Sequence, residues 1–461
     1  MNPARRHVPR LLVTALLLTL AVPFTATTLG QGRPASPTAP QGTPLTTQQP
    51  TDLSFVISGT GGKRFPIAIP PAIAPLNPEL QGQVVDPFHS TLTDDLGGSN
   101  VFLVAEPGLF PKGMRPPVTR EQGDAWIVSG AQFLLDTEIR PGPQITVVVH
   151  LYDLKTLKSV LDKTYTGEPR TARQMAHFLA NDLVRWATGK PGPFLTKIAF
   201  SSDRDAPGFK EIYLMDFDGE NQRRVTNYKS LSLAPDWSAD STKIVFQTYI
   251  KGPPGISIVM KEGGERRNVP VPTQLNASPS FSPDGKSIAY CGSVKGNPEI
   301  FVAGIDGSNV RRLTDSPAID STPRWTPSGR ELAFTSNRQG SPQIYLMDLE
   351  GTNVRRLTFA GNWSDEASFS PDGSKIAFAC RNEGDFQICI QDLLSARTVQ
   401  ISNGPGAHEN PTWSPDGSKL AWELTRGNST QIIIAGADGS NAKAVTSQGN
   451  NFSPAWSKSL E

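Results

Sequence analysis

The five histidines are the first residues to consider for chemistry, because histidine is a common general base and metal ligand. His408 and Glu409 match the start of the zinc motif His-Glu-x-x-His. Position 412 is threonine, and Pro411 would break the helix that this motif needs. The sequence therefore predicts no zinc site here. The isolated histidines are interpreted as boundary residues of the fold: His89, His150 and His177.

Other catalytic and ligand-binding motifs are incomplete. The glycine-rich stretch 59–63 ends in Lys63, but Arg64 follows where a phosphate-binding loop needs serine or threonine. The chain contains no Gly-x-Ser-x-Gly elbow of a serine hydrolase. Three Asp-Gly pairs that recur along the chain are interpreted as hairpin turns rather than calcium loops: Asp218, Asp306 and Asp438. We predict a protein that is not an enzyme, with no catalytic residue, no metal and no cofactor.

Composition narrows the class of partner. Lys and Arg total 44 against 43 Asp and Glu, a formal charge of +1, and no run of like charges is long enough to bind a polyanion. We therefore predict that the protein does not bind nucleic acid. Three cysteines are too few for a disulfide framework. We expect buried free thiols at Cys380 and Cys389, with pairing as the alternative if their hairpin turns tightly at Gly384.

The first 50 residues indicate export. Residues 1–30 combine basic Arg5, Arg6 and Arg10 with an apolar run at 11–22, which is the pattern of a signal peptide. The run is shorter than the roughly 20 residues of a membrane-spanning helix, and a retained anchor is the alternative. Residues 31–50 are rich in Pro, Thr and Gln, so we expect a flexible tether.

Residues 51–190 predict a compact α/β domain. We expect strands in four β-rich runs, at 65–69, 101–105, 126–135 and 145–154. A helix is expected to begin after Thr171, a good N-cap, and to end before Gly189. One apolar stripe follows helical spacing along it: Ala172, Met175, Ala176, Leu179, Leu183 and Trp186.

Residues 193–461 are repetitive. One aromatic recurs at spacings of 44, 44, 44, 44 and 43: Trp237, Phe281, Trp325, Phe369, Trp413 and Trp456. Each unit shows four short β-like segments, so we predict an all-β propeller of six blades. The chain enters at a second strand near 197–200 and ends with an orphan first strand near 453–457. We expect these two segments to pair and close the ring.

The combination of motifs resembles the TolB family from about residue 51 onward. The repeats Ser-Pro-Asp-Gly at Ser282, Ser370 and Ser414 are moderately specific. The stretch from Thr188 to Phe200 resembles the junction between the two domains of that family, and Phe65-Pro66-Ile67-Ala68-Ile69-Pro70 strengthens the match.

The resemblance implies a non-catalytic periplasmic protein of the Tol-Pal system, without cofactor, that supports envelope integrity and cell division. Members bind the peptidoglycan-associated lipoprotein, Pal, at one mouth of the propeller. Leu275 and Ser321 fall where the family places Pal contacts. We expect the candidate rim residues in the loops just before the innermost strands, which line the central channel: Leu275, Asn276, Ser321, Asp365, Glu366, His408 and Glu409.

A β-prone segment resembles the TolA-binding segment of the family: Leu53, Phe55, Val56 and Ile57. A first strand of the α/β domain is the equal alternative. In the family this segment lies close to the mature N-terminus, so the tract 31–50 puts the TolA contact in doubt. The functional hypothesis is a monomeric periplasmic adaptor. The alternative is a secreted propeller that binds a small ligand or carbohydrate, or a hydrolase-related propeller without its catalytic domain.

Overall fold

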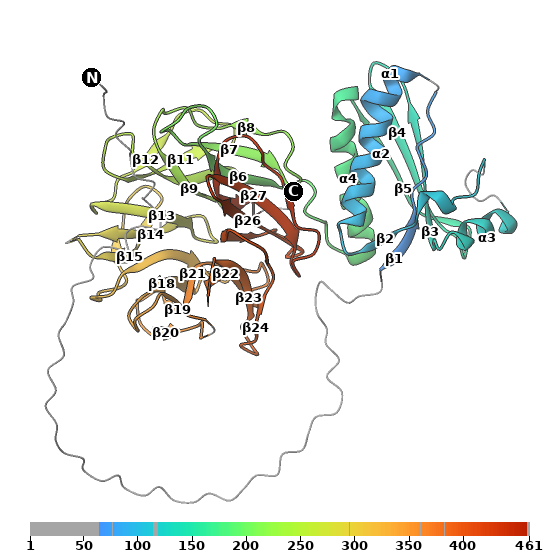
Figure 1. Cartoon of the computed structure of the whole chain (residues 1–461). Helices are drawn as coiled ribbons and strands as arrows, with labels where there is room; N and C mark the ends of the chain where they lie inside the picture. Colours follow the sequence, from blue (N-terminus) through green and yellow to red (C-terminus); the bar gives the residue numbers. More distant parts are fainter. Residues whose placement is uncertain are drawn as a thin grey trace, which may run out of the picture. The chain divides into compact units, whose positions relative to one another are not determined.

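The computed structural model describes residues 64–458 except 76, 114–118, 295, 360 and 382. An α/β domain is followed along the chain by a propeller of six four-stranded sheets (Figure 1). The predicted signal peptide, tether and TolA-binding segment lie outside the described residues. Within the described part, no helix has the length and apolarity that crossing a membrane requires.

The α/β domain contains one five-stranded sheet. Its strands are β1 (Phe65–Ala68), β2 (Phe102–Val104), β3 (Phe133–Arg140), β4 (Ile145–Asp153) and β5 (Lys158–Gly167). They lie in the order β2-β1-β3-β4-β5, with β1 parallel to both of its neighbours and the later pairs antiparallel. In β4 every second residue from Ile145 to Leu151 is buried, so one face of the strand packs and the other faces water.

Two long helices cover one face of this sheet, α2 (Asp86–Gly97) and α4 (Ala172–Thr188) (Figure 1). A single turn α1 (Pro78–Leu80) and a π-helix η2 (Gln81–Val85) lead into α2. The predicted limits of α4 are confirmed: Thr171 precedes it, and Gly189 ends it with a left-handed φ of 79°. The apolar stripe of α4 lies in the core, since Ala176, Leu179 and Leu183 are fully buried.

One predicted strand is wrong at its start. Residues 126–128 belong to helix α3 (Arg120–Val128), and β3 begins only at Phe133. Thr119 and Gln122 explain the difference, because their side chains form a reciprocal capping box that starts the helix. Trp126 then packs from α3 against the opposite face of the sheet, next to Ala68 and Leu134.

The predicted six-bladed propeller is confirmed, and blades are numbered here in chain order, with the closing blade last. The strands of blades 1 to 3 are β9 (Ser232–Trp237), β10 (Lys243–Thr248), β11 (Gly255–Met260), β12 (Arg267–Val269), β13 (Leu275–Phe281), β14 (Ser287–Ser293), β15 (Pro298–Gly304), β16 (Arg311–Arg312), β17 (Asp320–Trp325), β18 (Glu331–Ser336), β19 (Gln343–Asp348) and β20 (Arg355–Arg356). Those of blades 4 to 6 are β21 (Trp363–Phe369), β22 (Lys375–Arg381), β23 (Gln387–Asp392), β24 (Thr398–Gln400), β25 (Ala407–Trp413), β26 (Lys419–Arg426), β27 (Ser429–Gly436), β28 (Lys443–Ala444), β29 (Asn451–Trp456), β6 (Lys197–Ser202), β7 (Glu211–Asp216) and β8 (Arg223–Arg224).

The first strands of the six blades contact one another in turn and so form the centre of the ring. Blade 6 joins both ends of the propeller, because β29 pairs with β6 in the order β29-β6-β7-β8. The Arg204 guanidinium fastens this closure by donating to Asn451 Oδ1 at 2.8 Å. The predicted pairing of the two chain segments is thus present.

The recurring tryptophans bind neighbouring blades together. The indole nitrogen of Trp325 donates to the carbonyl of Ser280 in blade 2 at 3.1 Å, and that of Trp413 donates to Ser368 in blade 4 at 3.1 Å. Trp237 reaches Ala455 of the closing strand in the same way, at 2.9 Å. Each of these rings fills a gap between blades and also satisfies a carbonyl of the preceding blade.

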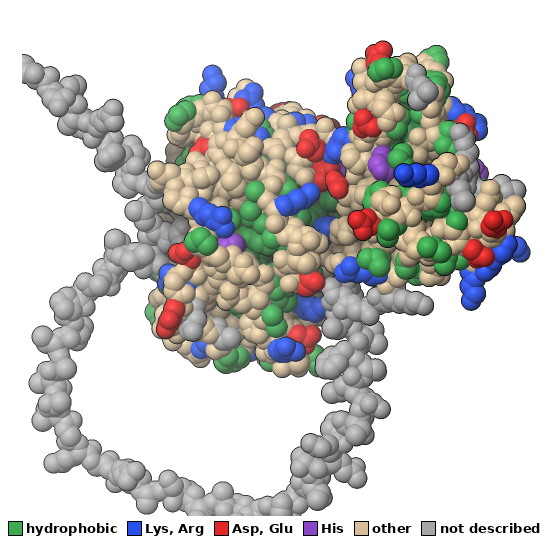
Figure 2. Space-filling view, turned by 45° about the vertical axis from the view of Figure 1, so that its right-hand side comes forward, with side chains coloured by type: hydrophobic (Ala, Val, Ile, Leu, Met, Phe, Trp, Pro, Cys, Tyr) green, Lys and Arg blue, Asp and Glu red, His purple; other side chains and the backbone are tan. Residues whose placement is uncertain are grey.

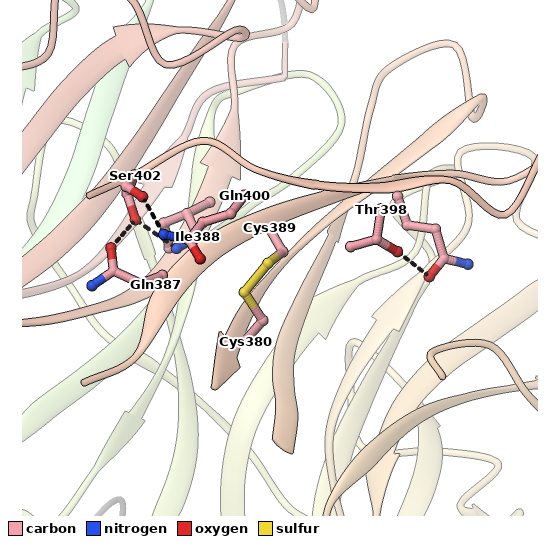
Figure 3. Close-up of a disulfide and its surroundings, with 8 residues drawn as sticks. Cys380, Gln387, Ile388, Cys389, Thr398, Gln400 and Ser402 are labelled. Atoms are coloured by element: carbon pink, nitrogen blue, oxygen red, sulfur yellow. Dashed lines mark hydrogen bonds between the residues drawn. A yellow bond between two sulfur atoms is a disulfide. The ribbon is translucent and has the colours of Figure 1, made fainter. Parts of the chain in front are cut away.

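The expectation of free thiols at Cys380 and Cys389 is wrong, because the two form a disulfide between β22 and β23 (Figure 3). The strand register pairs Cys380 with Gln387 and Phe378 with Cys389, so the cysteines are diagonal neighbours on one face, with Cα atoms 5.8 Å apart. Gly384, with φ of 70°, permits the tight hairpin. Cys291 is free and buried.

We expect replacement of both Cys380 and Cys389 by serine to lower the free energy of unfolding by about 2–3 kcal/mol, since the bond restricts the unfolded chain and lies in the core between blades 3 and 4. Urea denaturation of the oxidised wild type and the double variant checks this.

Iodoacetamide provides the control. In denaturant without reductant it should label only one of the three cysteines, and with reductant all three. Labelling of three cysteines without reductant would contradict the bond.

Candidate protein-binding site at the propeller mouth

Each innermost strand contains one residue in the left-handed conformation. These residues have φ between 48° and 58°: Ala234, Ser278, Thr322, Glu366, Asn410 and Ser453. The register with the second strand shifts at this point in every blade, which marks a β-bulge. Left-handed conformations cost a non-glycine residue about 1–2 kcal/mol, so the ring must hold all six in place.

Strand alternation before the bulge separates two kinds of predicted rim residue. Leu275 and Ser321 are partly exposed. Asn276 and His408 are buried, with exposed fractions of 5% and 4%. The Asn276 amide donates to the carbonyls of Pro254 and Thr273, both at 3.0 Å. Side chains at this strand position therefore serve packing inside the ring, and a partner would reach the residues beside them.

His408 illustrates the internal role. Its Nδ1 accepts a hydrogen bond from the Trp422 indole at 2.9 Å. Burial, followed by the charge of Arg426, lowers the pKa of His408 to about 4. The imidazole is neutral at pH 7, as an acceptor must be.

Asp365 and Glu366 lie on β21, partly exposed at its bulge, and connect blade 4 to both of its neighbours. Asp365 Oδ1 accepts hydrogen bonds from the hydroxyls of Thr335 at 2.6 Å and Thr322 at 3.2 Å, both in blade 3. Glu366 Oε2 accepts the backbone N–H of Asn410 in blade 5 at 2.7 Å. Hydrogen bonds accepted by these carboxylates thus connect blade 4 to blades 3 and 5 near the centre of the ring.

Glu409 lies directly opposite Glu423 in the β25–β26 register. Like charges in this arrangement destabilise a sheet unless one group is neutral. Glu423 Oε2 also accepts the backbone N–H of Ser453 on the closing strand at 2.5 Å. We call Asp365, Glu366, Glu409 and Glu423 the acidic wall.

Protonation relieves the repulsion within the acidic wall. Burial, then the charges of Glu423 and Asp365, raise the pKa of Glu409 to about 7. Burial also raises the pKa values of Glu366 and Glu423 above their ordinary range. Arg381 opposes the shift at Glu409, and Lys210 opposes it at Glu423. Of the acidic wall, Glu409 therefore changes charge near neutral pH.

Glu423 was missed by sequence reasoning, although the sequence holds a signal for it. The corresponding second-strand residues of the other blades are uncharged: Ser201, Gln247, Cys291, Thr335 and Ala379. A glutamate at this repeat position is an exception to the pattern. Only the register shows that it faces another glutamate.

Charges elsewhere on the propeller are mixed. On the face shown in Figure 2, basic and acidic side chains are interspersed and do not gather into a large area of one sign. This agrees with the formal charge of +1 and favours contact with another protein over a polyanion.

One group of described side chains has ligand atoms close enough for a metal ion, namely His177, Asp216 and Asp218. Its carboxylates are already paired with cations, since Arg173 contacts Asp218 and Lys197 contacts Asp216. We interpret the group as a network of ion pairs.

The acidic wall predicts a pH dependence of stability. An ordinary glutamate has a pKa of 4.5, and folded Glu409 titrates at about 7. Between these values the folded protein binds more protons than the unfolded chain, so the free energy of unfolding falls as pH rises from about 4.5 to 7. We expect Glu409→Gln to be more stable than wild type by about 1–3 kcal/mol at pH 8 and nearly equal at pH 5.

Denaturant unfolding at the two pH values measures this difference. Glu350→Gln, in the exposed turn after β19, is the matched control and should follow wild type at both. A Glu409→Gln protein less stable than wild type at pH 8 would show that the charged form is stabilising.

A protein-family model described as the TolB beta propeller domain, PD40, matches residues 184–460 of this chain. The chain is 34% identical over 177 residues to the Tol-Pal system protein TolB of Syntrophotalea carbinolica, covering 38% of this chain and 41% of that protein. It is 32% identical over 199 residues to the Tol-Pal system protein TolB of Desulfosudis oleivorans, covering 42% and 45%. The chain thus spans less than half the length of these curated relatives.

The fold is also similar to a solved structure. TolB from Acinetobacter baumannii superposes with a TM-score of 0.74 and 27% sequence identity, over 87% of this chain and 98% of that chain. This similarity includes the α/β domain as well as the propeller.

Proposed function

The chain belongs to the TolB beta propeller family, and we propose that it is a non-enzymatic periplasmic adaptor of the Tol-Pal system that binds Pal through the propeller mouth. The observation that carries the proposal is the arrangement at that mouth. Leu275, Ser321, Asp365, Glu366 and Glu409 lie at or beside the bulge of adjoining innermost strands, and all are partly exposed. A surface made by several blades suits a protein partner better than a small substrate.

The Pal contact can be tested at Ser321. We expect Ser321→Arg to weaken binding to the periplasmic domain of Pal from the same organism by at least about tenfold, because a long cation would replace a small side chain inside a packed interface. Isothermal titration calorimetry measures the affinity. Ser328→Arg is the matched control, in the exposed turn after β17, beyond the other end of that strand.

A folded wild type that binds no Pal would refute the Pal assignment. Loss of binding in Ser328→Arg but not in Ser321→Arg would place the contact at the other mouth.

We extend the proposal to TolA, through the segment that contains Leu53, Phe55, Val56 and Ile57. Such a β-prone run can add a strand to the edge of a partner sheet. Replacing Phe55 and Ile57 by aspartate should abolish pull-down of the periplasmic part of TolA and leave the affinity for Pal unchanged. Retained TolA binding would favour the role of this segment as a strand of the α/β domain.

The ligand-binding alternative finds no support at the edge of blade 2. A cavity of about 600 Å³ there is lined mainly by charged and small side chains, including Arg267, Lys286 and Asp306, without an aromatic residue. Ligand sites are usually lined by apolar and aromatic side chains. We also propose that the protein supports envelope integrity and cell division through its adaptor role. This proposal depends on the binding of Pal and is tested by the same measurement.

A further inference from the structure

His177 lies where the α/β domain meets the propeller. It projects from α4, and its Nδ1 lies 2.7 Å from Asp95 Oδ2 of α2. Its Nε2 lies 3.5 Å from Asp218 Oδ2, in the turn between β7 and β8 of blade 6. The His177 and Asp95 side chains are each only 5% exposed. One imidazole therefore stands between a carboxylate of its own domain and a carboxylate of the propeller.

Other charged groups complete this junction. Arg173, one turn earlier on α4, contacts Asp218 at 2.5 Å and the Thr91 hydroxyl at 3.0 Å. From blade 5, Lys419 Nζ donates to the carbonyl of Gly98 at 2.7 Å, and its positive charge lowers the pKa of Asp95.

Asp216 lies close to His177 and Asp218, and its carboxylate is paired with Lys197 and Asn221. The rings of Phe217 and His177 lie nearly perpendicular to each other, with centroids 5.4 Å apart.

The position between two carboxylates favours a charged imidazole. A neutral imidazole donates from one nitrogen and turns a lone pair toward the other partner, whereas the imidazolium donates from both. Burial alone would lower the pKa of His177. The neighbouring carboxylates of Asp218 and Asp95 outweigh burial and raise this pKa to about 9.

We propose that protonated His177 is a lock that holds the α/β domain on the propeller, and that the two domains unfold independently when this histidine loses its charge. The lock goes beyond partner binding at the mouth and does not depend on it. The pKa of His177 is about 9 in the docked state, and an ordinary histidine has a pKa of 6.5. The docked state therefore binds this proton a few hundredfold more tightly than the unfolded chain does.

The direction of the pH effect follows from the raised pKa. The stabilising contribution of His177 is complete below the unfolded value of 6.5 and is lost as pH rises through about 9. Asp218, whose pKa is lowered to about 2, stays charged throughout this range. Burial also lowers the pKa of Lys419 from its ordinary value of 10.5, so the variant His177→Gln at pH 7 is needed to separate the histidine from this lysine.

Calorimetry of the mature protein tests the lock. We expect one unfolding transition for wild type at pH 7, and two transitions either for wild type at pH 10 or for His177→Gln at pH 7. His150→Gln is the matched control, because His150 pairs with Asp162 on an exposed part of the same domain, and it should keep one transition. A single transition for His177→Gln at the wild-type temperature would overturn the proposal.

If His177→Gln fails to fold, nuclear magnetic resonance still tests the proposal, because it follows the titration of His177 in the folded wild type. The His177 imidazole of folded wild type should lose its proton well above pH 8. In Asp218→Asn the acid dissociation constant of this imidazolium should be at least about tenfold larger, because one stabilising carboxylate is gone. A wild-type His177 that titrates at or below 6.5 would overturn the lock, whatever the variants do.

Discussion

A four-stranded blade cannot bury both of its own faces, and the whole propeller depends on the ring that covers them. The ring closes through β29 and β6, whose residues are about 250 positions apart, as in the pair Asn451 and Ser202. Closure places every innermost edge at the centre and leaves outer strands of only two or three residues. Short outer strands offer little template for aggregation. The sheet that joins the two chain segments therefore protects all six blades.

The sequence carried much of this architecture because the blade is repeated. Aromatics at a fixed period revealed the number of blades, and the unpaired first and last segments revealed the closure. Single elements were less predictable. The apolar run at 126–135 looked like one strand, and the capping box of Thr119 and Gln122 turned its first part into a helix. The pairing of Cys380 with Cys389 depended on a strand register that spacing alone does not determine.

At the mouth, the prediction that the candidate rim residues lie in the loops just before the innermost strands is wrong, because all of them lie within β13, β17, β21 and β25. Regular alternation places Leu275 and Ala277 partly exposed and Asn276 between them buried. The bulge interrupts this alternation at Ser278, which is partly exposed next to Ala277. Glu366 bonds to the next blade through a residue 44 positions away, and such contacts exist only in the closed ring. The sequence therefore identifies candidate rim residues, but it cannot predict which of them are buried or bonded to a neighbouring blade.

Six copies of one unit would form a symmetric mouth, yet the glutamate and aspartate side chains at these first-strand positions occur in only part of the ring. Blades 4 and 5 contribute the acidic wall, whereas the equivalent first-strand positions of blades 1 and 2 hold Leu233, Ala234, Ala277 and Ser278. Facing glutamates lower stability, and natural proteins usually break local rules of this kind at functional sites. A uniform ring would not need this asymmetry for folding. An uneven mouth can fix the orientation of a single partner.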